Sequence, residues 1–287
     1  MSGIHRIDLG TPSLLAFRGP DAVRFLNGQL TQDVRRVAGG KISLPSCVTD
    51  AKGRLQFRVT VTEAAAGALW IAGLAGRAED LEARLTRYLI ADDVEVGDLS
   101  GKYALHHFTG PMPEPPSGVV ARESDRFGIA GTDWWVPVGV AVGFPAEVEL
   151  LEGDALESLR IGNGVPAWGR ELLEGILPPE ARLEETDISY HKGCYIGQEV
   201  ISRIKSAGKV NRRLTRFVFD AAVPVAAGPL ENAAGEVTSV SPLASAGVRP
   251  ALGYVKRGAS DLFFKAADGT IYPVVTAEPP APPRNRA

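Results

Sequence analysis

The feature that most restricts how this chain can fold is a strictly alternating segment at residues 54–62. Apolar and polar side chains follow one another there: Leu55, Phe57, Val59 and Val61 against Arg54, Gln56, Arg58 and Thr60. Successive side chains of a β-strand point to opposite faces of its sheet. The segment therefore predicts a half-buried strand, with one face in an apolar core and one polar face.

The flanking segments predict an α+β lobe around this strand. Residues 21–34 carry apolar side chains at helical spacing, with Asp21 near the start. A second strand is expected at 68–72, a helix at 78–90 and an extended segment at 94–96. A short helix is expected at 154–161, followed by an ordered loop at 162–180 that is rich in glycine and proline. The alternation of strands and helices favours the α+β class.

The pattern after Arg213 becomes entirely β. Several short apolar runs are separated by turns, one of them at 232–235 and another with the hairpin signal Asp268-Gly269. These runs predict a small antiparallel barrel or sandwich. The final segment is rich in proline and is expected to be disordered.

Composition limits the class of protein. The chain has 287 residues, of which 45% are hydrophobic, and a formal net charge of −3. The negative balance argues against a generic nucleic-acid binder, although local basic patches stay open. The longest apolar run, 64–76, is shorter than a membrane-spanning helix requires, and the start does not read as a secretory signal. With two cysteines, we expect a cytoplasmic protein without a structural disulfide.

One of the two cysteines stands in the segment HKGCYIGQEVISR at 191–203. A short helix is predicted at 197–207, with Glu199 and Arg203 paired across one turn and Gly208 at its end. Cys194 therefore precedes a helix start and lies beside Lys192, and both features should lower the thiol pKa. The residues alone leave two possibilities open, a functional thiol and a buried structural cysteine.

Basic residues are concentrated around this thiol, where Glu199 is the sole acid between 192 and 216. They are Lys192, Arg203, Lys205, Lys209, Arg212, Arg213 and Arg216. Such a cluster could hold an anionic ligand, or it could be a solvated basic face.

Several other chemistries are not supported. A Cys-His hydrolase needs a distant histidine, and His191 is too close in sequence to be an obvious base. His106 and His107 would point to opposite faces of a strand, so they could not bind one metal together. Two cysteines cannot complete an iron–sulfur cluster within one chain. Rossmann, Walker A and zinc motifs are absent from the sequence.

The segment KGCYIGQE at 192–199 resembles the signature of the YgfZ-like folate-binding proteins, which are relatives of the glycine-cleavage T protein (aminomethyltransferase). Supporting segments follow in the family's order: FLNGQLTQDV at 25–34, TDAKGR at 49–54, LRIGNGVPAWGRE at 159–171, LPPE at 177–180, and GEVTSVSP with ALGYVKR near the end. The resemblance covers nearly the whole chain and is weakest over 103–150.

The resemblance implies a multi-lobed α+β cloverleaf with a C-terminal antiparallel β-barrel. It divides the chain into a folate-binding region at 1–211, a barrel at 212–275 and a disordered tail at 276–287. The first region would hold two interleaved lobes, 1–45 with 150–211, and 46–149. It also implies tetrahydrofolate or a one-carbon derivative as cofactor, without a stably bound metal. The implied role is assembly or repair of iron–sulfur enzymes, with a link to tRNA modification and no membrane partner.

The resemblance also suggests which residues act. Cys194 would be the reactive group and Lys192 would depress its pKa. Candidates for folate contact are Asn27, Gln29, Trp168, Glu180, Gln198, Glu199 and Arg203. A pterin needs polar groups at its edge and an aromatic or apolar face, while cations suit its glutamyl tail or RNA phosphates. For Trp168, plain packing within the loop is the alternative.

Two other functions stay open. An aminomethyltransferase is disfavoured, because the T protein carries an aspartate where this chain has Gln56, Phe57 and Arg58. Asn163 or Glu180 could replace a pterin-facing glutamate of that enzyme. The other alternative is a non-catalytic module in which folate only stabilises the fold. Whether the protein is an enzyme of one-carbon or thiol chemistry is left undecided.

Overall fold

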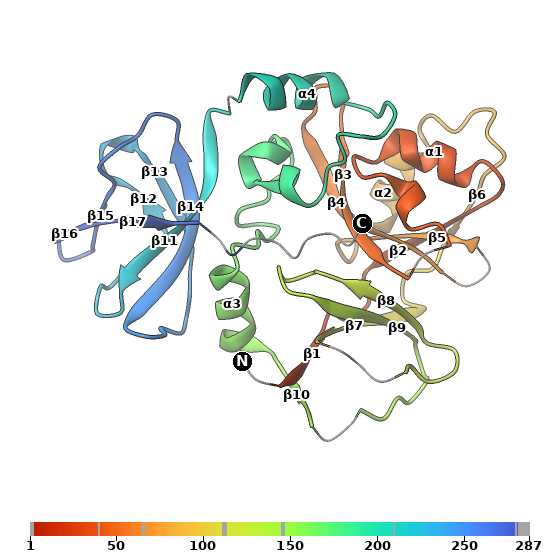
Figure 1. Ribbon diagram of the computed structural model, residues 1–287, viewed down its shortest axis with the longest axis horizontal. Coiled ribbons are helices and arrows are strands. Elements are labelled where there is room, and N and C mark those ends of the chain that lie inside the picture. The colour runs from red at the N-terminus through yellow and green to blue at the C-terminus, as the bar shows by residue number, and fades with distance from the viewer. Residues whose placement is uncertain are drawn as a thin grey trace.

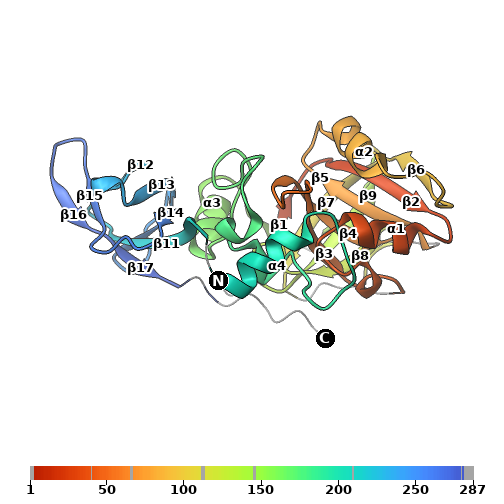
Figure 2. The same cartoon turned by 90° about the horizontal axis from the view of Figure 1, so that it is seen from above.

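Three five-stranded sheets organise the computed structural model, which describes residues 3–39, 41–64, 67–110, 114–144, 147–208, 210–278 and 280. Figure 1 shows the sheets as three groups, with α3 (Gly153–Gly162) and α4 (Gln198–Ala207) between the C-terminal sheet and the other two. In Figure 2 the C-terminal sheet lies at one end of an elongated molecule. Within the described ranges, no helix is both long and apolar enough to cross a bilayer.

The N-terminal sheet is antiparallel and has the order β3-β4-β5-β2-β6. Its strands are β2 (Ser13–Arg18), β3 (Ser43–Thr49), β4 (Leu55–Glu63), β5 (Leu69–Gly73) and β6 (Glu95–Asp98). One face is covered by α1 (Ala22–Gln29) and α2 (Ala78–Thr86), which share a core with Phe17, Val59 and Ile71. The predicted α+β lobe is confirmed here. The sheet crosses the predicted lobe boundary at 45/46, because β2 pairs with β5.

The alternating strand is confirmed except at its start. The pairing of β3 with β4 places Val48 opposite Phe57 and Thr49 opposite Leu55, so Gln56 is an extra residue in a bulge. Phe57, Val59 and Val61 lie in the helix-covered core as predicted. Leu55 instead packs with Cys47 on the other side of the sheet. The prediction that Leu55 shares their face is wrong, because the bulge reverses the alternation.

Both helices of this lobe end earlier than predicted. The chain leaves α1 at Leu30, whose backbone is extended and forms a bridge with Val48 of β3. Thr31 then donates its backbone N–H to the Cys47 carbonyl. Pairing with the sheet thus replaces the last helical turn that the sequence pattern predicts.

The central sheet is mixed and has the order β10-β1-β7-β9-β8. Its strands are β1 (Ile4–Asp8), β7 (Tyr103–Thr109), β8 (Val120–Ser124), β9 (Gly131–Pro137) and β10 (Val148–Leu150). Leu105 and Trp135 of this sheet pack against Trp70 and Leu14 of the N-terminal sheet. The two sheets therefore share an apolar layer, and the rest of the space between them is available for a site.

The C-terminal sheet has the order β12-β13-β14-β11-β17, and all its pairs are antiparallel. Its strands are β11 (Arg212–Asp220), β12 (Gly228–Pro229), β13 (Gly235–Val240), β14 (Val248–Lys256) and β17 (Val275–Ala277). The predicted Asp268-Gly269 hairpin joins β15 (Phe263–Lys265) to β16 (Ile271–Pro273). Pairing among the described residues leaves β12 and β17 as edges, so the barrel closure is not confirmed.

The predicted tail begins later than residue 276. Thr276 and Ala277 still pair with β11, and Glu278 forms an ion pair of 2.8 Å with Arg182. Residues 279 and 281–287 lie outside the described part, and the prediction for them stays untested.

A buried carboxylate joins the loop after α3 to the C-terminal sheet. Glu171 is 1% exposed. It accepts hydrogen bonds from Arg160 Nη1 at 2.9 Å, Ala167 N at 3.0 Å, Thr238 Oγ1 at 2.7 Å and Ser239 Oγ at 2.6 Å. The loop predicted at 162–180 is therefore ordered, as expected, and its position is fixed against β13.

Candidate functional site

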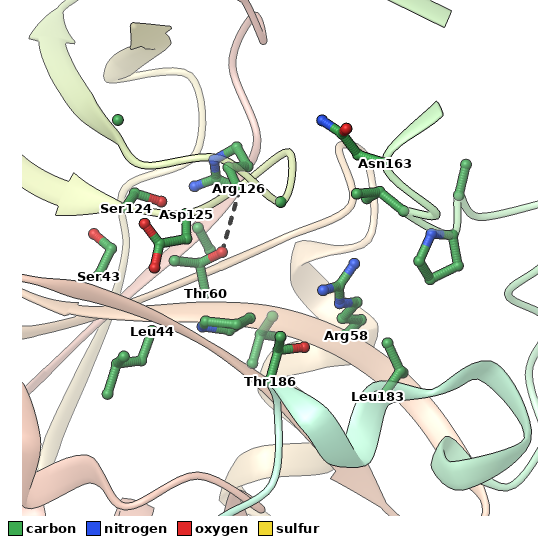
Figure 3. Close-up of a pocket in the computed structure, with 18 of the residues that line it drawn as sticks. Ser43, Leu44, Arg58, Thr60, Ser124, Asp125, Arg126, Asn163, Leu183 and Thr186 are labelled. Carbon is green, nitrogen blue, oxygen red and sulfur yellow. Dashed lines mark hydrogen bonds between the residues drawn. The ribbon is translucent and has the colours of Figure 1, made fainter. Parts of the chain in front are cut away.

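A cavity of about 960 Å³ lies between the N-terminal and central sheets. Its other walls are the 163–168 segment after α3 and the 181–186 segment, so two sheets and two further segments of the chain enclose it. Figure 3 shows Ser43, Thr60 and Arg58 rising from the N-terminal sheet, with Arg126 and Asn163 facing them from the other side. We call this space the central cavity.

Arg58 lines the central cavity and is held from behind by a buried carboxylate. Its Nε donates to Asp187 Oδ2 at 2.6 Å, and its Nη2 donates to Asp187 Oδ1 at 3.1 Å. The Asp187 side chain is fully buried, whereas that of Arg58 is 21% exposed. Burial by itself lowers the pKa of Arg58, but Asp187 more than offsets this and raises it. The paired aspartate therefore keeps the guanidinium charged and fixed in orientation.

Arg126 is held in the same way on the opposite wall. Its Nη2 donates to Asp133 Oδ2 at 2.7 Å, and His107 Nδ1 lies 2.8 Å from Asp133 Oδ1. Burial alone would raise the pKa of Asp133, but Arg126 and His107 hold it well below the ordinary value. Arg126 Nη1 then reaches Thr60 Oγ1 at 3.3 Å, at the surface of the cavity. His107 is thus a partner of Asp133 within the sheet.

The Trp168 end of the cavity is less polar. Trp168 lines the cavity and packs against a buried group that includes Leu172 and Leu183. Trp168 therefore both borders the cavity and packs within the loop, and its contact with a ligand stays a prediction. Asn163 lines the cavity as well, and its Nδ2 donates to the Phe127 carbonyl at 2.9 Å.

The signature segment lies apart from the central cavity, against the end of α1. Lys192 is 8% exposed, and its Nζ donates to the carbonyls of Asn27 and Leu30 at 2.6 Å and of Gln32 at 2.8 Å. Burial lowers the pKa of Lys192 to about 7, with Asp33 opposing the shift. The ammonium is therefore engaged by backbone carbonyls, and its predicted effect on the thiol stays untested.

Gly197 brings the signature segment into close contact with the turn before β4. Its φ is 87°, and a Cβ there would lie 2.5 Å from the Asp50 carbonyl oxygen. Thr49 Oγ1 also donates to the Ile196 carbonyl at 2.6 Å. Only glycine fits this combination of a left-handed conformation and close backbone approach.

The two cysteines differ in accessibility. Cys47 is buried, and burial raises the pKa of its thiol well above the ordinary value. Cys194 is exposed, so the structural alternative of a buried residue does not apply to it. It lines neither the central cavity nor the smaller cavity of about 410 Å³ beside α4. The thiol therefore faces solvent, four residues before α4 begins at Gln198.

Asn27 and Gln29, predicted to contact folate, have partners within the protein. Asn27 Oδ1 accepts from the Val34 backbone N–H at 3.1 Å, and Gln29 Oε1 accepts from Arg84 Nη1 at 3.1 Å. Neither lines the central cavity. Gln56, at the place of the T protein's aspartate, also faces Arg84 because of the bulge.

The other predicted contacts are likewise outside the central cavity. Glu180 lies 3.5 Å from Arg212 Nε, and Glu199 pairs with Arg203 at 2.7 Å on the exposed face of α4, as predicted. Gln198 is the first residue of α4 and lines neither cavity. Of the predicted folate contacts, the structure places Trp168 alone on the central cavity.

Two members of the predicted basic cluster, Arg212 and Arg213, pair with acids from outside residues 192–216. Arg213 pairs with Glu184 at 2.7 Å, and Arg212 lies 3.3 Å from Glu236. Lys205 Nζ lies 3.6 Å from the centre of the Tyr190 ring, and Lys209 is outside the described residues. The concentrated positive field expected from sequence spacing is therefore weaker in the fold.

The sequence did not indicate Ser43 and Arg126 as site residues. It indicated Arg58 only as one of the residues found where the T protein has its aspartate. The signal for Arg58 was present, since it lies on the polar face of the alternating segment. Arg126 lies in 103–150, where the sequence pattern was poor, and its partner Asp133 is on the next strand. No local pattern reveals such a pairing.

The fold places the chain in a known class. The aminomethyltransferase T of the glycine cleavage system from Bartonella henselae superposes with a TM-score of 0.77 over 97% of this chain and 86% of that one, at 19% identity. No family model matches the chain. The chain therefore has the fold of the glycine-cleavage T protein.

Relatives in sequence narrow the class further. The tRNA-modifying protein YgfZ of Klebsiella pneumoniae is 26% identical over 247 residues, covering 78% of this chain and 75% of that protein. The same protein from Escherichia coli K12 is 26% identical over 246 residues, with the same coverage of 78% and 75%. An aminomethyltransferase of Rubrobacter xylanophilus is 27% identical over 276 residues, covering 84% and 73%. In sequence the chain is therefore similar to the YgfZ proteins and to the aminomethyltransferases, and it has the fold of the latter.

Proposed function

We propose that the protein binds a reduced folate in the central cavity and supports the assembly or repair of iron–sulfur enzymes. The observation that carries the proposal is the cavity itself, about 960 Å³ inside a T-protein fold and lined by residues 163–168 of the LRIGNGVPAWGRE motif. The YgfZ relatives are named tRNA-modifying proteins, which supports a link to tRNA modification.

The lining suits a tetrahydrofolate. Trp168 offers an aromatic surface for a flat ring, while Arg58 and Arg126 offer fixed hydrogen-bond donors on facing walls. Ser43 Oγ is buried without a hydrogen-bond partner among the described residues, as a group awaiting a ligand would be. When bound, the folate would supply a carrier for one-carbon units, and these residues would bind and orient it.

Titration with tetrahydrofolate tests this site through tryptophan fluorescence. Trp70, Trp134 and Trp135 are buried in the sheets, whereas Trp168 lines the cavity. A saturable change in the wild type that disappears in Trp168→Phe would support the proposal. Absence of saturable binding, measured in parallel by calorimetry, would contradict it.

We further propose that Cys194 is the reactive group and acts on a partner that reaches the surface. Its exposure and its distance in the fold from the lining of the central cavity favour a macromolecular partner or client over the bound folate. The turn that presents it is fixed by the Lys192 and Gly197 contacts. A pre-set exposed thiol suits exchange with a group on another molecule.

Rescue of a bacterial strain lacking its YgfZ-like protein tests the pathway and the residue together. Cys194→Ala should fail to restore iron–sulfur enzyme activity, whereas Cys47→Ala, the matched control, should restore it when the protein is folded. Full rescue by Cys194→Ala would instead favour the non-catalytic folate module.

Aminomethyltransfer is the second candidate, favoured by the Rubrobacter xylanophilus relative. Gln56 argues against it, because a neutral amide cannot replace a carboxylate and the bulge directs it to Arg84. Release of ammonia and a tetrahydrofolate product from an aminomethylated lipoyl carrier would establish this activity. Its absence in the purified, folate-loaded protein would remove this candidate.

A further inference from the structure

The central cavity has a polar end where β3 and β4 meet the β8–β9 hairpin. Thr60 Oγ1 contacts the Arg126 guanidinium there, and Figure 3 shows Ser43 on the same side of the cavity, with Asp125 between it and Thr60. Ser43 is 4% exposed, and its hydroxyl has no hydrogen-bond partner among the described residues. A buried hydroxyl without a partner is energetically costly, so a polar group of a ligand would be a suitable partner for it.

Buried Asp133 fixes the orientation of Arg126 on the side of the cavity that holds the Ser43 and Thr60 hydroxyls. Both oxygens of Asp133 accept from it, at 3.2 Å from Nε and 2.7 Å from Nη2. Asp133 is itself fully buried between Arg126 and His107. This leaves Nη1, with its long 3.3 Å contact to Thr60, as the part of the guanidinium directed to the cavity. A donor fixed from behind in this way binds an acceptor with little loss of conformational freedom.

We propose that Ser43, Thr60 and Arg126 form a subsite for an oxygen acceptor of the ligand, either an oxo group or a carboxylate. The inference rests on the proposed binding of folate, which carries both groups: an oxo group on the pterin and carboxylates on the glutamyl tail. The Asp125 carboxylate lies beside Ser43 in Figure 3 and lines the same cavity. Its negative charge disfavours a second carboxylate, which favours the pterin oxo group as the ligand oxygen. The subsite then fixes the pterin at the hairpin end.

Three probes separate the two sources of the oxygen. They are tetrahydrofolate, tetrahydropteroate, which lacks the glutamyl carboxylates, and the amino analogue in which an amino group replaces the pterin oxo group. Calorimetry would give the affinity of each probe for the wild type, Ser43→Ala and Arg126→Gln. Arg122→Gln is the matched control, because Arg122 on β8 donates to the backbone carbonyls of Glu63 and Ala121 and does not line the cavity.

We expect the wild type to prefer tetrahydrofolate to the amino analogue, and both subsite variants to reduce this preference by about tenfold, one lost buried hydrogen bond. The control should keep it. If the variants instead erase the preference for tetrahydrofolate over tetrahydropteroate, the subsite binds a glutamyl carboxylate. That result also supports a subsite for an oxygen acceptor. If the affinity ratios among the three probes are unchanged in both variants, the subsite inference is wrong, while the folate proposal is unaffected. If the wild type binds none of the probes, the folate proposal itself fails. Ser43→Ala removes only a hydroxyl, so it stays informative even if Arg126→Gln unfolds.

Discussion

Replacing Glu171 with glutamine should destabilise the folded protein by about 3 kcal/mol. Glu171 receives four hydrogen bonds in a site where it is 1% exposed, and one donor is the guanidinium of Arg160. Glutamine keeps the size and one acceptor oxygen but loses the charge. Its amide nitrogen would face either Arg160 and Ala167 or the hydroxyls of Thr238 and Ser239.

The magnitude follows from which donors lose their acceptor. Removing one member of a buried ion pair costs about 3–5 kcal/mol, because the other charge is left uncompensated. Arg160 also contacts Glu157 through both Nε and Nη2, which keeps the expected cost near the lower limit. The Ser239 hydroxyl can rotate and accept from the new amide, so its bond need not be lost. Ser239→Ala alone should cost about 1 kcal/mol.

Urea unfolding followed by far-UV circular dichroism would measure both values. Glu174→Gln is the matched control, because Glu174 lies on the same loop and is exposed. It should unfold within about 0.5 kcal/mol of the wild type. An E171Q variant as stable as this control would refute the reasoning, since it would mean that the buried charge contributes nothing net.

Three further predictions concern other buried contacts. Gly197→Ala should cost about 2–4 kcal/mol, because it adds left-handed strain to a clash with the Asp50 carbonyl; thermal unfolding with Gly193→Ala as control checks this, and an equal effect of both would contradict it. Lys192 has a folded pKa of about 7 against an ordinary 10.5, so the unfolded chain takes up its proton first as pH falls. The free energy of unfolding should therefore decrease as pH falls from 10.5 to about 7. In urea titrations at several pH values, Lys192→Met should flatten this pH dependence. An unchanged slope would argue against the shift. Asp133, whose pKa is held below its ordinary value, contributes stability that is lost as pH falls below that value. Asp133→Asn should lower the free energy of unfolding by about 3 kcal/mol near neutral pH. If it lowers this free energy by less than the control Arg122→Gln does, the ion pair of Asp133 with Arg126 does not stabilise the fold.

The elements that local patterns predicted well are those whose ends are also set locally. Helix α4 ends at Ala207, before Gly208 in a left-handed conformation, as its sequence indicates. The start of β4 was predicted less well, because its bulge arises from pairing with Thr49. Likewise Leu30 leaves α1 to pair with Val48, which no helical periodicity can reveal.

The site was predictable only in part for a similar reason. Motif resemblance named Trp168 and Cys194 as candidates; the structure shows that Trp168 lines the cavity and that Cys194 is exposed, and their roles stay predictions. It could not show that Lys192 turns toward the carbonyls of α1. The cavity arginines depend on aspartates that pair with them only after the sheets form, and Arg58 and Asp187 are 129 residues apart.

The bulge at Gln56 has a consequence for how such a site can change over time. Gain or loss of a single residue there decides which face of the sheet carries each side chain of early β4, while the strand beyond Phe57 keeps its pairing. A protein of this fold could therefore change which residue faces Arg84 by an insertion or deletion, without any substitution in the cavity wall. Deleting Gln56 should restore regular pairing and leave Arg58 and Thr60 in place. The first residues of β4 can thus change in evolution independently of the residues further along the strand that shape the cavity.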